Sequence, residues 1–127
     1  MTSTWSATDL QTIDDEDEVA LASRRRDGSL SSPATIWIVR VGDEVFVRSA
    51  FGPGNRWYAR ALSSAAGHIA IGGVDRDVSF EHGAGAAENT DIDEAFHAKY
   101  DAAYPKEYVD PVVDATAQGC TLRLIPA

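Results

Sequence analysis

Runs of β-branched and aromatic residues define the centre of the chain. Residues 35–41 are almost wholly of these types, which favours a strand, and residues 44–49 have the same character. Gly42-Asp43 between them predicts a tight two-residue turn, because glycine accepts a positive φ at little steric cost. Asn55 then predicts the N-cap of a short helix over residues 56–64. The centre is therefore predicted to be a strand hairpin followed by a helix.

Further strands flank this centre on both sides. Residues 18–24 alternate, with Val19, Leu21 and Ser23 on the side expected to face a core. Residues 68–74 and 77–81 predict a second hairpin that turns at Asp75-Arg76, with a turn at Gly72-Gly73 as the open alternative. Residues 120–125 form a closing strand. Six strands in this order, with helices inserted between them, predict a mainly β protein built as an antiparallel β-barrel.

The N-terminal segment, residues 1–17, predicts a short helix followed by an acidic connection. The helix has Ser6 or Thr8 as its cap, and its apolar face carries Trp5, Leu10 and Ile13. The acidic run at residues 14–18 is interpreted as a solvated connection. A metal site needs ligands that converge from several directions, and a contiguous run does not supply them.

The second half of the chain predicts a loop and one longer helix. Residues 82–89 are rich in glycine and alanine and are expected to form a flexible loop. A helix then begins at Thr90, with Thr90 and Asp93 as an approximate capping box. Its apolar stripe is formed by residues at every fourth position, namely Ile92, Phe96 and Tyr100. Residues 108–113 are predicted to be irregular or to start a further helical turn.

Length and composition indicate one soluble domain over residues 1–127. The net charge of −9 and pI near 4.6 argue against binding to nucleic acid or to an anionic membrane surface. Cys120 has no intramolecular disulfide partner and lies in an apolar run, so we expect it to be buried in a protein of the reducing cytoplasm. Residues 1–5 lack the features of a signal peptide, and no apolar run approaches the roughly 20 residues that span a bilayer.

Several kinds of reactive site are excluded by spacing. His68, His82 and His97 have no paired spacing for zinc, and one cysteine cannot build a thiolate site. The Gly83-Ala84-Gly85 stretch lacks the third glycine of a dinucleotide-binding loop. The roles of the three histidines stay open. We interpret His68 as a barrel or interface residue.

Arginines gather around the predicted central hairpin, against the overall negative charge. Guanidinium groups bind phosphate or carboxylate as a planar fork, neighbouring hydroxyls add donors, and indole rings offer a flat apolar surface. We therefore expect a small-molecule ligand with an anionic tail on an aromatic ring. The alternative is that these arginines only pair with acids on the surface. The arginines are Arg24, Arg25, Arg26, Arg40, Arg48, Arg56 and Arg60. The hydroxyl groups are those of Ser29, Thr35 and Ser49, and the indole rings are those of Trp37 and Trp57. The orientation of Trp37 stays open.

Three stretches resemble a known group of proteins. Residues 48–52 and 56–62, which read Arg-Ser-Ala-Phe-Gly and Arg-Trp-Tyr-Ala-Arg-Ala-Leu, resemble a pattern of the deazaflavin-dependent nitroreductase-like split barrels. Residues 24–29 resemble the basic, glycine-containing loop that holds the cofactor's phosphate in that group. The chain as a whole is similar to an uncharacterised bacterial domain family related to the FMN-binding, pyridoxamine-phosphate-oxidase-like split barrels.

This resemblance implies a six-stranded Greek-key split barrel that forms a homodimer, with FMN or a deazaflavin in the groove between subunits. The implied cofactor-binding residues are Arg25, Arg26 and Ser29 for the phosphate, Arg48, Ser49 and Thr35 nearby, Arg56 and Arg60 along the groove, and Trp57 against the ring. No side chain need act as a covalent catalyst, because the cofactor carries the hydride chemistry. Two alternatives stay open: a cofactor-less relative that binds a small anion, and a purely structural dimer.

Overall fold

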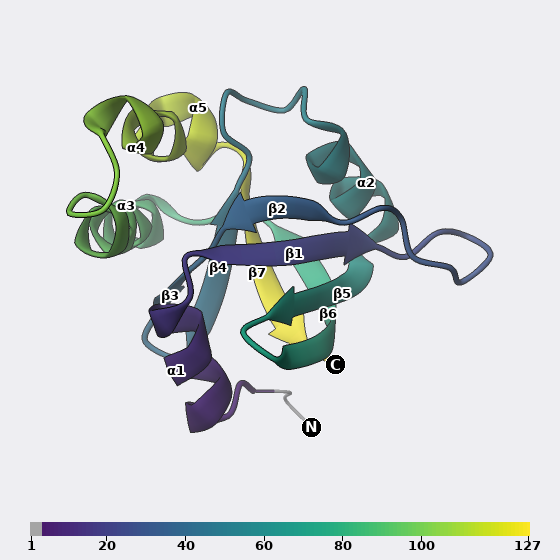
Figure 1. Cartoon of the computed structure of the whole chain (residues 1–127). Helices are drawn as coiled ribbons and strands as arrows, with labels where there is room; N and C mark the ends of the chain where they lie inside the picture. The colour runs from purple at the N-terminus through teal and green to yellow at the C-terminus, as the bar shows by residue number, and fades with distance from the viewer. Residues whose placement is uncertain (1–3) are drawn as a thin grey trace.

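A computed structural model describes residues 4–127, without the side chains of Ala86 and Ala87 (Figure 1). The first three residues of the predicted domain therefore lie outside the described part. Its helices are α1 (Ala7–Asp15), α2 (Arg56–Ser64), α3 (Ala86–Tyr100), α4 (Lys106–Val113) and α5 (Ala115–Gln118). Its strands are β1 (Glu18–Ser23), β2 (Ala34–Trp37), β3 (Val39–Val41), β4 (Glu44–Arg48), β5 (Ala66–Ile71), β6 (Val74–His82) and β7 (Thr121–Pro126).

The strands form one antiparallel sheet in the order β2-β1-β5-β6-β7-β4-β3. Its two outer strands, β2 and β3, are consecutive pieces of one segment separated only by Ile38. That segment pairs with β1 through its first half and with β4 through its second half. The sheet therefore closes on itself, and the split barrel predicted from the sequence is confirmed.

The break at Ile38 corrects the predicted strand count from six to seven. Residues 35–41 were expected to form one strand, but the segment changes partners at Ile38, whose N–H is bonded to the Tyr100 hydroxyl at 3.1 Å instead of to a strand. An apolar pattern predicts extended backbone and does not reveal a change of hydrogen-bond partner. The tight turn at Gly42-Asp43 is confirmed, since Val41 pairs with Glu44.

The second hairpin turns at Gly72 and Gly73, so the preferred prediction of a turn at Asp75-Arg76 is wrong. Both glycines have positive φ, 51° and 85°, and this conformation costs glycine least. Asp75 and Arg76 instead pair with β5 inside the ladder.

Two helix starts differ in detail from their predictions. Helix α3 begins at Ala86, with Gly85 as the N-cap, and the Glu88 carboxylate accepts a hydrogen bond from the Gly85 N–H at 3.3 Å. The predicted capping box at Thr90 and Asp93, and a loop reaching to residue 89, are therefore wrong. Helix α2 begins where predicted, but the Asn55 amide bonds to other loop atoms and does not cap the helix.

Two apolar clusters hold the fold together. The barrel interior is filled by inward-facing strand residues such as Val19, Leu21 and Ile69, and α1 and α2 both add side chains to it. The predicted face of α1 is confirmed by the burial of Trp5, Leu10 and Ile13, and Ser6 caps that helix. A second cluster joins α3 to the outer side of β3 and β4 through the predicted stripe of Ile92, Phe96 and Tyr100. Cys120 is buried, as expected.

Helix α4 covers the segment that the sequence left open between irregular structure and a further helical turn. Its eight residues run from Lys106 to Val113 and bury Val109 and Val112. Across residues 4–127, every helix is too short or too polar to cross a membrane.

Candidate functional site

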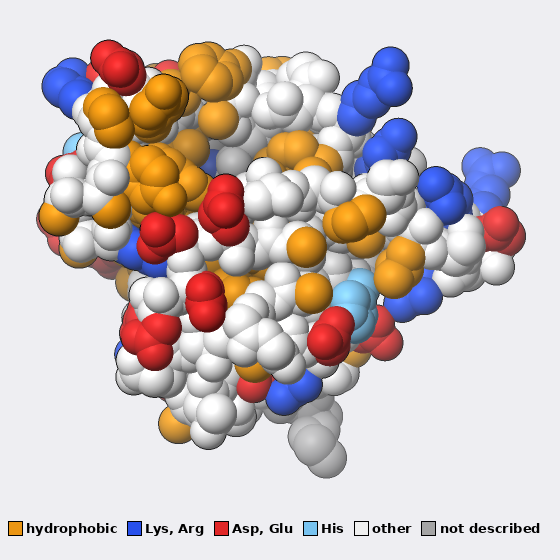
Figure 2. Space-filling model, in the orientation of Figure 1, with side chains coloured by type: hydrophobic (Ala, Val, Ile, Leu, Met, Phe, Trp, Pro, Cys, Tyr) orange, Lys and Arg blue, Asp and Glu red, His pale blue; other side chains and the backbone are white. Residues whose placement is uncertain are grey.

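An arginine-lined cleft lies between α2 and the loop that follows β1. Its volume is about 750 Å³, and four arginines line it, namely Arg24, Arg25, Arg26 and Arg60. No carboxylate is among the described residues that line the cleft. Figure 2 shows Lys and Arg side chains gathered on this side of the molecule, over α2 and the loop after β1. We call this cavity the arginine cleft.

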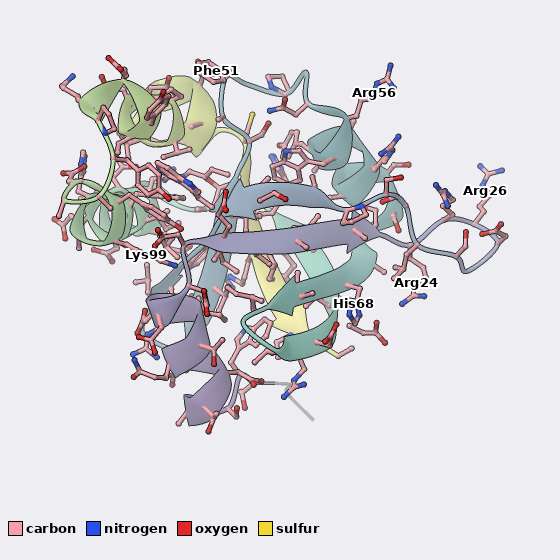
Figure 3. The ribbon with its side chains drawn as sticks, in the orientation of Figure 1. Arg24, Arg26, Phe51, Arg56, His68 and Lys99 are labelled. Atoms are coloured by element: carbon pink, nitrogen blue, oxygen red, sulfur yellow. The ribbon has the colours of Figure 1, made fainter. Side chains whose placement is uncertain are left out.

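The donors of the arginine cleft differ in how far they are already occupied. The Arg25 guanidinium donates to the Leu30 carbonyl at 2.8 Å, and Arg24 is paired with Asp77. Arg26 and Arg60 have no hydrogen bond or ion pair with any residue that the structure describes. In Figure 3 the Arg26 side chain extends away from the barrel. The cleft therefore holds positive charge that the chain itself does not neutralise.

Hydroxyl groups supply the rest of the polar lining of the arginine cleft. Ser23, at the end of β1, is 3% exposed, and its hydroxyl oxygen has no hydrogen-bond partner among the described residues. A buried polar atom without a partner costs about 1–3 kcal/mol, so Ser23 is suited to a ligand that reaches this wall. The other lining hydroxyls belong to Ser31, Ser63 and Ser64.

Asp27 lies in the same loop but does not line the arginine cleft. Its carboxylate accepts hydrogen bonds from the Ser29 hydroxyl at 2.6 Å and from the Ser29 N–H at 2.9 Å. The Ser29 hydroxyl is the main reason that the pKa of Asp27 is lowered. Asp27 therefore closes its own turn, and this bond also occupies the Ser29 hydroxyl.

A second cavity of about 530 Å³, which we call the aromatic pocket, lies beside the N-terminal end of α2. The arginine cleft lies further along the same helix. Its walls come from β2, from the loop before α2 and from the region of α4. Its aromatic lining comprises Trp37, Phe51, Trp57, Tyr104 and Tyr108. Trp37 stacks on Tyr100 with ring centroids 4.0 Å apart and an interplanar angle of 3°. The open question about Trp37 is thus answered: it packs outside the barrel, against α3 and the pocket.

Arg48 lines the aromatic pocket, yet its side chain is fully buried and its donors are occupied. The guanidinium forms an ion pair with Asp93 and donates to the Val112 carbonyl at 2.8 Å. Further bonds reach the Thr121 hydroxyl at 3.0 Å and the Asn89 side chain at 3.1 Å. Arg48 thereby fastens α3, α4 and β7 together beneath the pocket, and it leaves the pocket without a free charge.

The two cavities are neighbours along one helix face. Trp57 lines the aromatic pocket and Arg60 lines the arginine cleft, and residues three apart on a helix point in nearly the same direction. The same order holds on the other wall, where Ser31 lines the cleft and Ala34 begins the pocket. One elongated ligand can therefore place a charged end in the cleft and a ring in the pocket.

The nine residues expected to bind a cofactor fall into three groups. Arg25, Arg26 and Arg60 line the arginine cleft, and Thr35, Arg48 and Trp57 line the aromatic pocket. Ser29, Ser49 and Arg56 line neither cavity. The Ser49 hydroxyl is buried and donates to the Gly52 carbonyl at 2.5 Å, so it holds the loop before α2. Arg56 extends into solvent at the start of α2 (Figure 3).

Sequence reasoning missed the serines of the arginine cleft and the tyrosines of the aromatic pocket. Ser63 and Ser64 follow Arg60 at helical spacings of three and four, so the helix pattern was sufficient to place them on its face. The tyrosines Tyr104 and Tyr108 come from the region of α4, whose packing beside β2 depends on contacts distant in sequence. No local pattern indicates them.

The possible metal ligands among the described residues do not form a metal site. No group of three or more His, Cys, Asp or Glu side chains among them is arranged to hold a metal ion. His82 bonds to the Gly119 carbonyl at 3.1 Å, and His97 pairs with Asp101 one helical turn away at 2.9 Å.

Comparison with solved structures defines the class of fold as the split barrel. A conserved hypothetical protein from Mycobacterium tuberculosis is similar with a TM-score of 0.68 and 13% identity, over 98% of this chain and 81% of that one. A putative pyridoxamine 5'-phosphate oxidase from Listeria innocua is similar with a TM-score of 0.63 and 10% identity, over 92% and 89%. A protein described as an F420 reductase is similar with a TM-score of 0.56 and 12% identity, over 92% and 91%.

The family follows from the sequence itself. A family model with the description "Uncharacterized protein conserved in bacteria (DUF2255)" matches residues 9–124, and the chain belongs to this family. The resemblance stated from the sequence, to an uncharacterised bacterial family related to these split barrels, is confirmed. No curated protein matches the chain in sequence.

Proposed function

We propose that this protein binds a flavin-type cofactor, FMN or a deazaflavin, and acts as an oxidoreductase. The observation that carries the proposal is the adjacency of an arginine cleft and an aromatic pocket along one face of α2, with Arg60 in one and Trp57 in the other. Each cavity, at about 750 and about 530 Å³, has the size of a common ligand site, about 300–1,000 Å³. Side by side they have room for an anionic tail and a ring system. Solved split barrels with printed descriptions of a pyridoxamine 5'-phosphate oxidase and an F420 reductase add support at the level of fold.

The chain's own groups divide the work of binding. Arg25, Arg26 and Arg60 hold the phosphate of the tail, and the Ser23 hydroxyl gains the partner it lacks within the chain. Trp57 packs against the ring. A bound flavin supplies hydride transfer, and the protein supplies orientation and exclusion of water. These residues fit such a group, because the unpaired Arg26 and Arg60 and the orphaned Ser23 hydroxyl all belong to the lining of one cavity that has an apolar one beside it.

The remaining predicted residues have supporting roles in this proposal. Thr35 offers a hydroxyl at the wall of the aromatic pocket, while Arg48 and Ser49 fix the shape of that pocket from beneath. Ser29 orders the loop that carries Arg25 and Arg26 through its bonds with Asp27. Arg56 contributes only a long-range positive potential near the α2 N-terminus.

We further propose that the protein is a homodimer in which a second copy covers the aromatic pocket. Phe51, on the pocket rim, is 85% exposed and has a φ of 65°, a strained conformation for a bulky residue. Tyr108 beside the same pocket is 60% exposed.

A reducing cytoplasm is the compartment that suits this proposal. A flavoprotein of this kind exchanges hydride with soluble partners, and the single cysteine, Cys120, is buried and free.

The experiment is a titration of the purified protein with FMN and with a deazaflavin, followed by visible absorbance. We expect saturable binding in which Arg25→Ala together with Arg26→Ala weakens affinity about tenfold or more, since a charge-assisted hydrogen bond contributes about 1.5–3 kcal/mol. Arg40→Ala together with Lys106→Ala removes the same charge from surface ion pairs far from the cleft and serves as the control.

Two results would overturn the proposal in different ways. If neither cofactor binds, the flavin assignment fails. If small anions then raise the melting temperature in wild type but not in the double arginine variant, the protein is the cofactor-less anion binder that the sequence left open.

A further inference from the structure

A histidine–aspartate cluster lies directly behind the arginine cleft and reaches it through Arg24. His68 on β5 is bonded through Nδ1 to Asp77 at 3.0 Å and through Nε2 to Asp75 at 3.0 Å, both on β6. The same Asp77 oxygen accepts a bond from Arg24 at 2.9 Å. Arg24 in turn donates to the Gly28 carbonyl at 2.9 Å, inside the loop that carries Arg25 and Arg26. Figure 3 shows Arg24 turned back toward His68.

We propose that His68 and Asp77 are positioning residues for the arginine cleft, and that the protonation of His68 sets how tightly the cleft holds an anion. This inference rests on the proposed use of the cleft for an anionic ligand. It adds to that proposal a proton-linked control that acts from outside the cavity, because neither residue lines the cleft.

The geometry suits the doubly protonated imidazole. A neutral imidazole has one N–H and one lone pair, so it can donate to only one of two carboxylates. Here both ring nitrogens face a carboxylate oxygen at hydrogen-bond distance. These bonds, first from Asp75 and then from Asp77, raise the pKa of His68 above its ordinary value of 6.5. His68 therefore keeps its proton to a higher pH than a free imidazole does.

Charge counting gives the direction of the effect. Charged His68 and Arg24 balance Asp75 and Asp77, the groups that face them from β6, so the cluster is neutral below the pKa of His68. When His68 loses its proton, one negative charge beside the cleft is left unbalanced, and Arg24 becomes the only cation among the described residues that pairs with Asp77. Both changes disfavour an anion in the cleft. Anion affinity is therefore expected to fall as pH rises.

The test is a titration with sulfate, followed by NMR shifts of the backbone amides in the β1–β2 loop. Sulfate stays fully ionised across the range, so the ligand itself does not titrate. For wild type we expect affinity about threefold weaker at about pH 8.5 than at about pH 6, in keeping with a partly exposed charge interaction of less than 1 kcal/mol. Reciprocity requires that saturating sulfate raise the pKa of His68 by about half a unit.

Matched variants separate positioning from general effects of pH. His68→Gln is expected to bind sulfate with the same affinity at both pH values. Asp75 bonds to His68 but not to Arg24. Asp75→Asn therefore lowers the pH at which affinity changes, and because it removes one negative charge it also strengthens sulfate binding at low pH. Asp77 bonds to both His68 and Arg24. Asp77→Asn is expected to reduce the pH dependence, because it removes the link between His68 and Arg24.

The outcomes distinguish this inference from the proposed function. Sulfate binding with equal affinity at both pH values, or an equal pH dependence in His68→Gln, overturns the proton linkage and leaves the arginine cleft intact as an anion site. Absence of sulfate binding at about pH 6 overturns both.

Discussion

Trp57 and Arg60 lie three residues apart on α2, yet each lines a different cavity. Since α2 is a regular helix from Arg56 to Ser64, the separation between an indole ring and a guanidinium group is fixed along its face. The helix thereby sets the distance that a bound ligand must have between its ring and its charged end. This relationship is the physical basis of the proposed function.

The first prediction concerns Arg48 as a structural ion. Its fully buried guanidinium is paired with Asp93 and bonded to α4 and β7. Arg48→Met is expected to lower the free energy of unfolding by about 3 kcal/mol, because it leaves a partly buried carboxylate without its cation. Urea denaturation measures this. Arg26→Met, at an exposed site, is the control and should change stability by less than about 0.5 kcal/mol; equal stability of the two variants would count against this role.

A second prediction concerns the seam of the barrel, by which we mean the break at Ile38 where the segment of β2 and β3 changes its partner strand. The Tyr100 hydroxyl accepts from the Ile38 N–H at 3.1 Å and also contacts the Asp17 carbonyl at 2.6 Å. Tyr100→Phe should cost about 1–3 kcal/mol by leaving buried backbone groups unpaired. It should also speed hydrogen exchange at the Ile38 amide, which native-state exchange followed by NMR detects. Tyr108→Phe, at an exposed ring, is the control; unchanged exchange at Ile38 in the Tyr100 variant would contradict this account.

The barrel was predictable from the sequence because its strands and turns are local features. The alternation of Val19, Leu21 and Ser23, the turn at Gly42-Asp43 and the length of the helix after Asn55 all depend on near neighbours. The seam at Ile38 was not predictable, because it depends on the tyrosine hydroxyl of a helix 62 residues away. The turn at Gly72-Gly73 was missed for a different reason. Both candidate turns had acceptable residues, and the local pattern alone did not decide between them.

The candidate site was predictable only in its charge. The arginines were expected to gather at one site. Those of residues 24–26 and Arg60 line one cavity, whereas Arg48 and Arg56 do not line it. Arg48 shows the limit of such reasoning. The sequence reveals a guanidinium group at the end of a strand, whereas its occupation by Asp93 depends on the packing of α3 beneath the pocket.

A third prediction concerns pH and Lys99. Burial lowers the pKa of Lys99 to about 8 from an ordinary value of 10.5, with the acidic run opposing the shift. Between these two values the unfolded chain binds the proton more tightly than the folded one, so stability gains with rising pH. The unfolding free energy of wild type minus that of Lys99→Met should therefore rise from about pH 8 to about pH 10.5 and be level below that range. Urea unfolding at several pH values measures it; a difference that is flat or falls would refute the assignment.

The most direct test of the central claim compares FMN with riboflavin, which has the same ring and lacks the phosphate. Binding is measured by fluorescence titration in wild type, in Trp57→Leu, and in Arg26→Ala combined with Arg60→Ala. We predict that wild type prefers FMN by about tenfold or more, that the arginine variant loses this preference, and that Trp57→Leu weakens both ligands by the same factor. Equal affinity of wild type for the two ligands would contradict the account, because the arginine cleft would then play no part in binding.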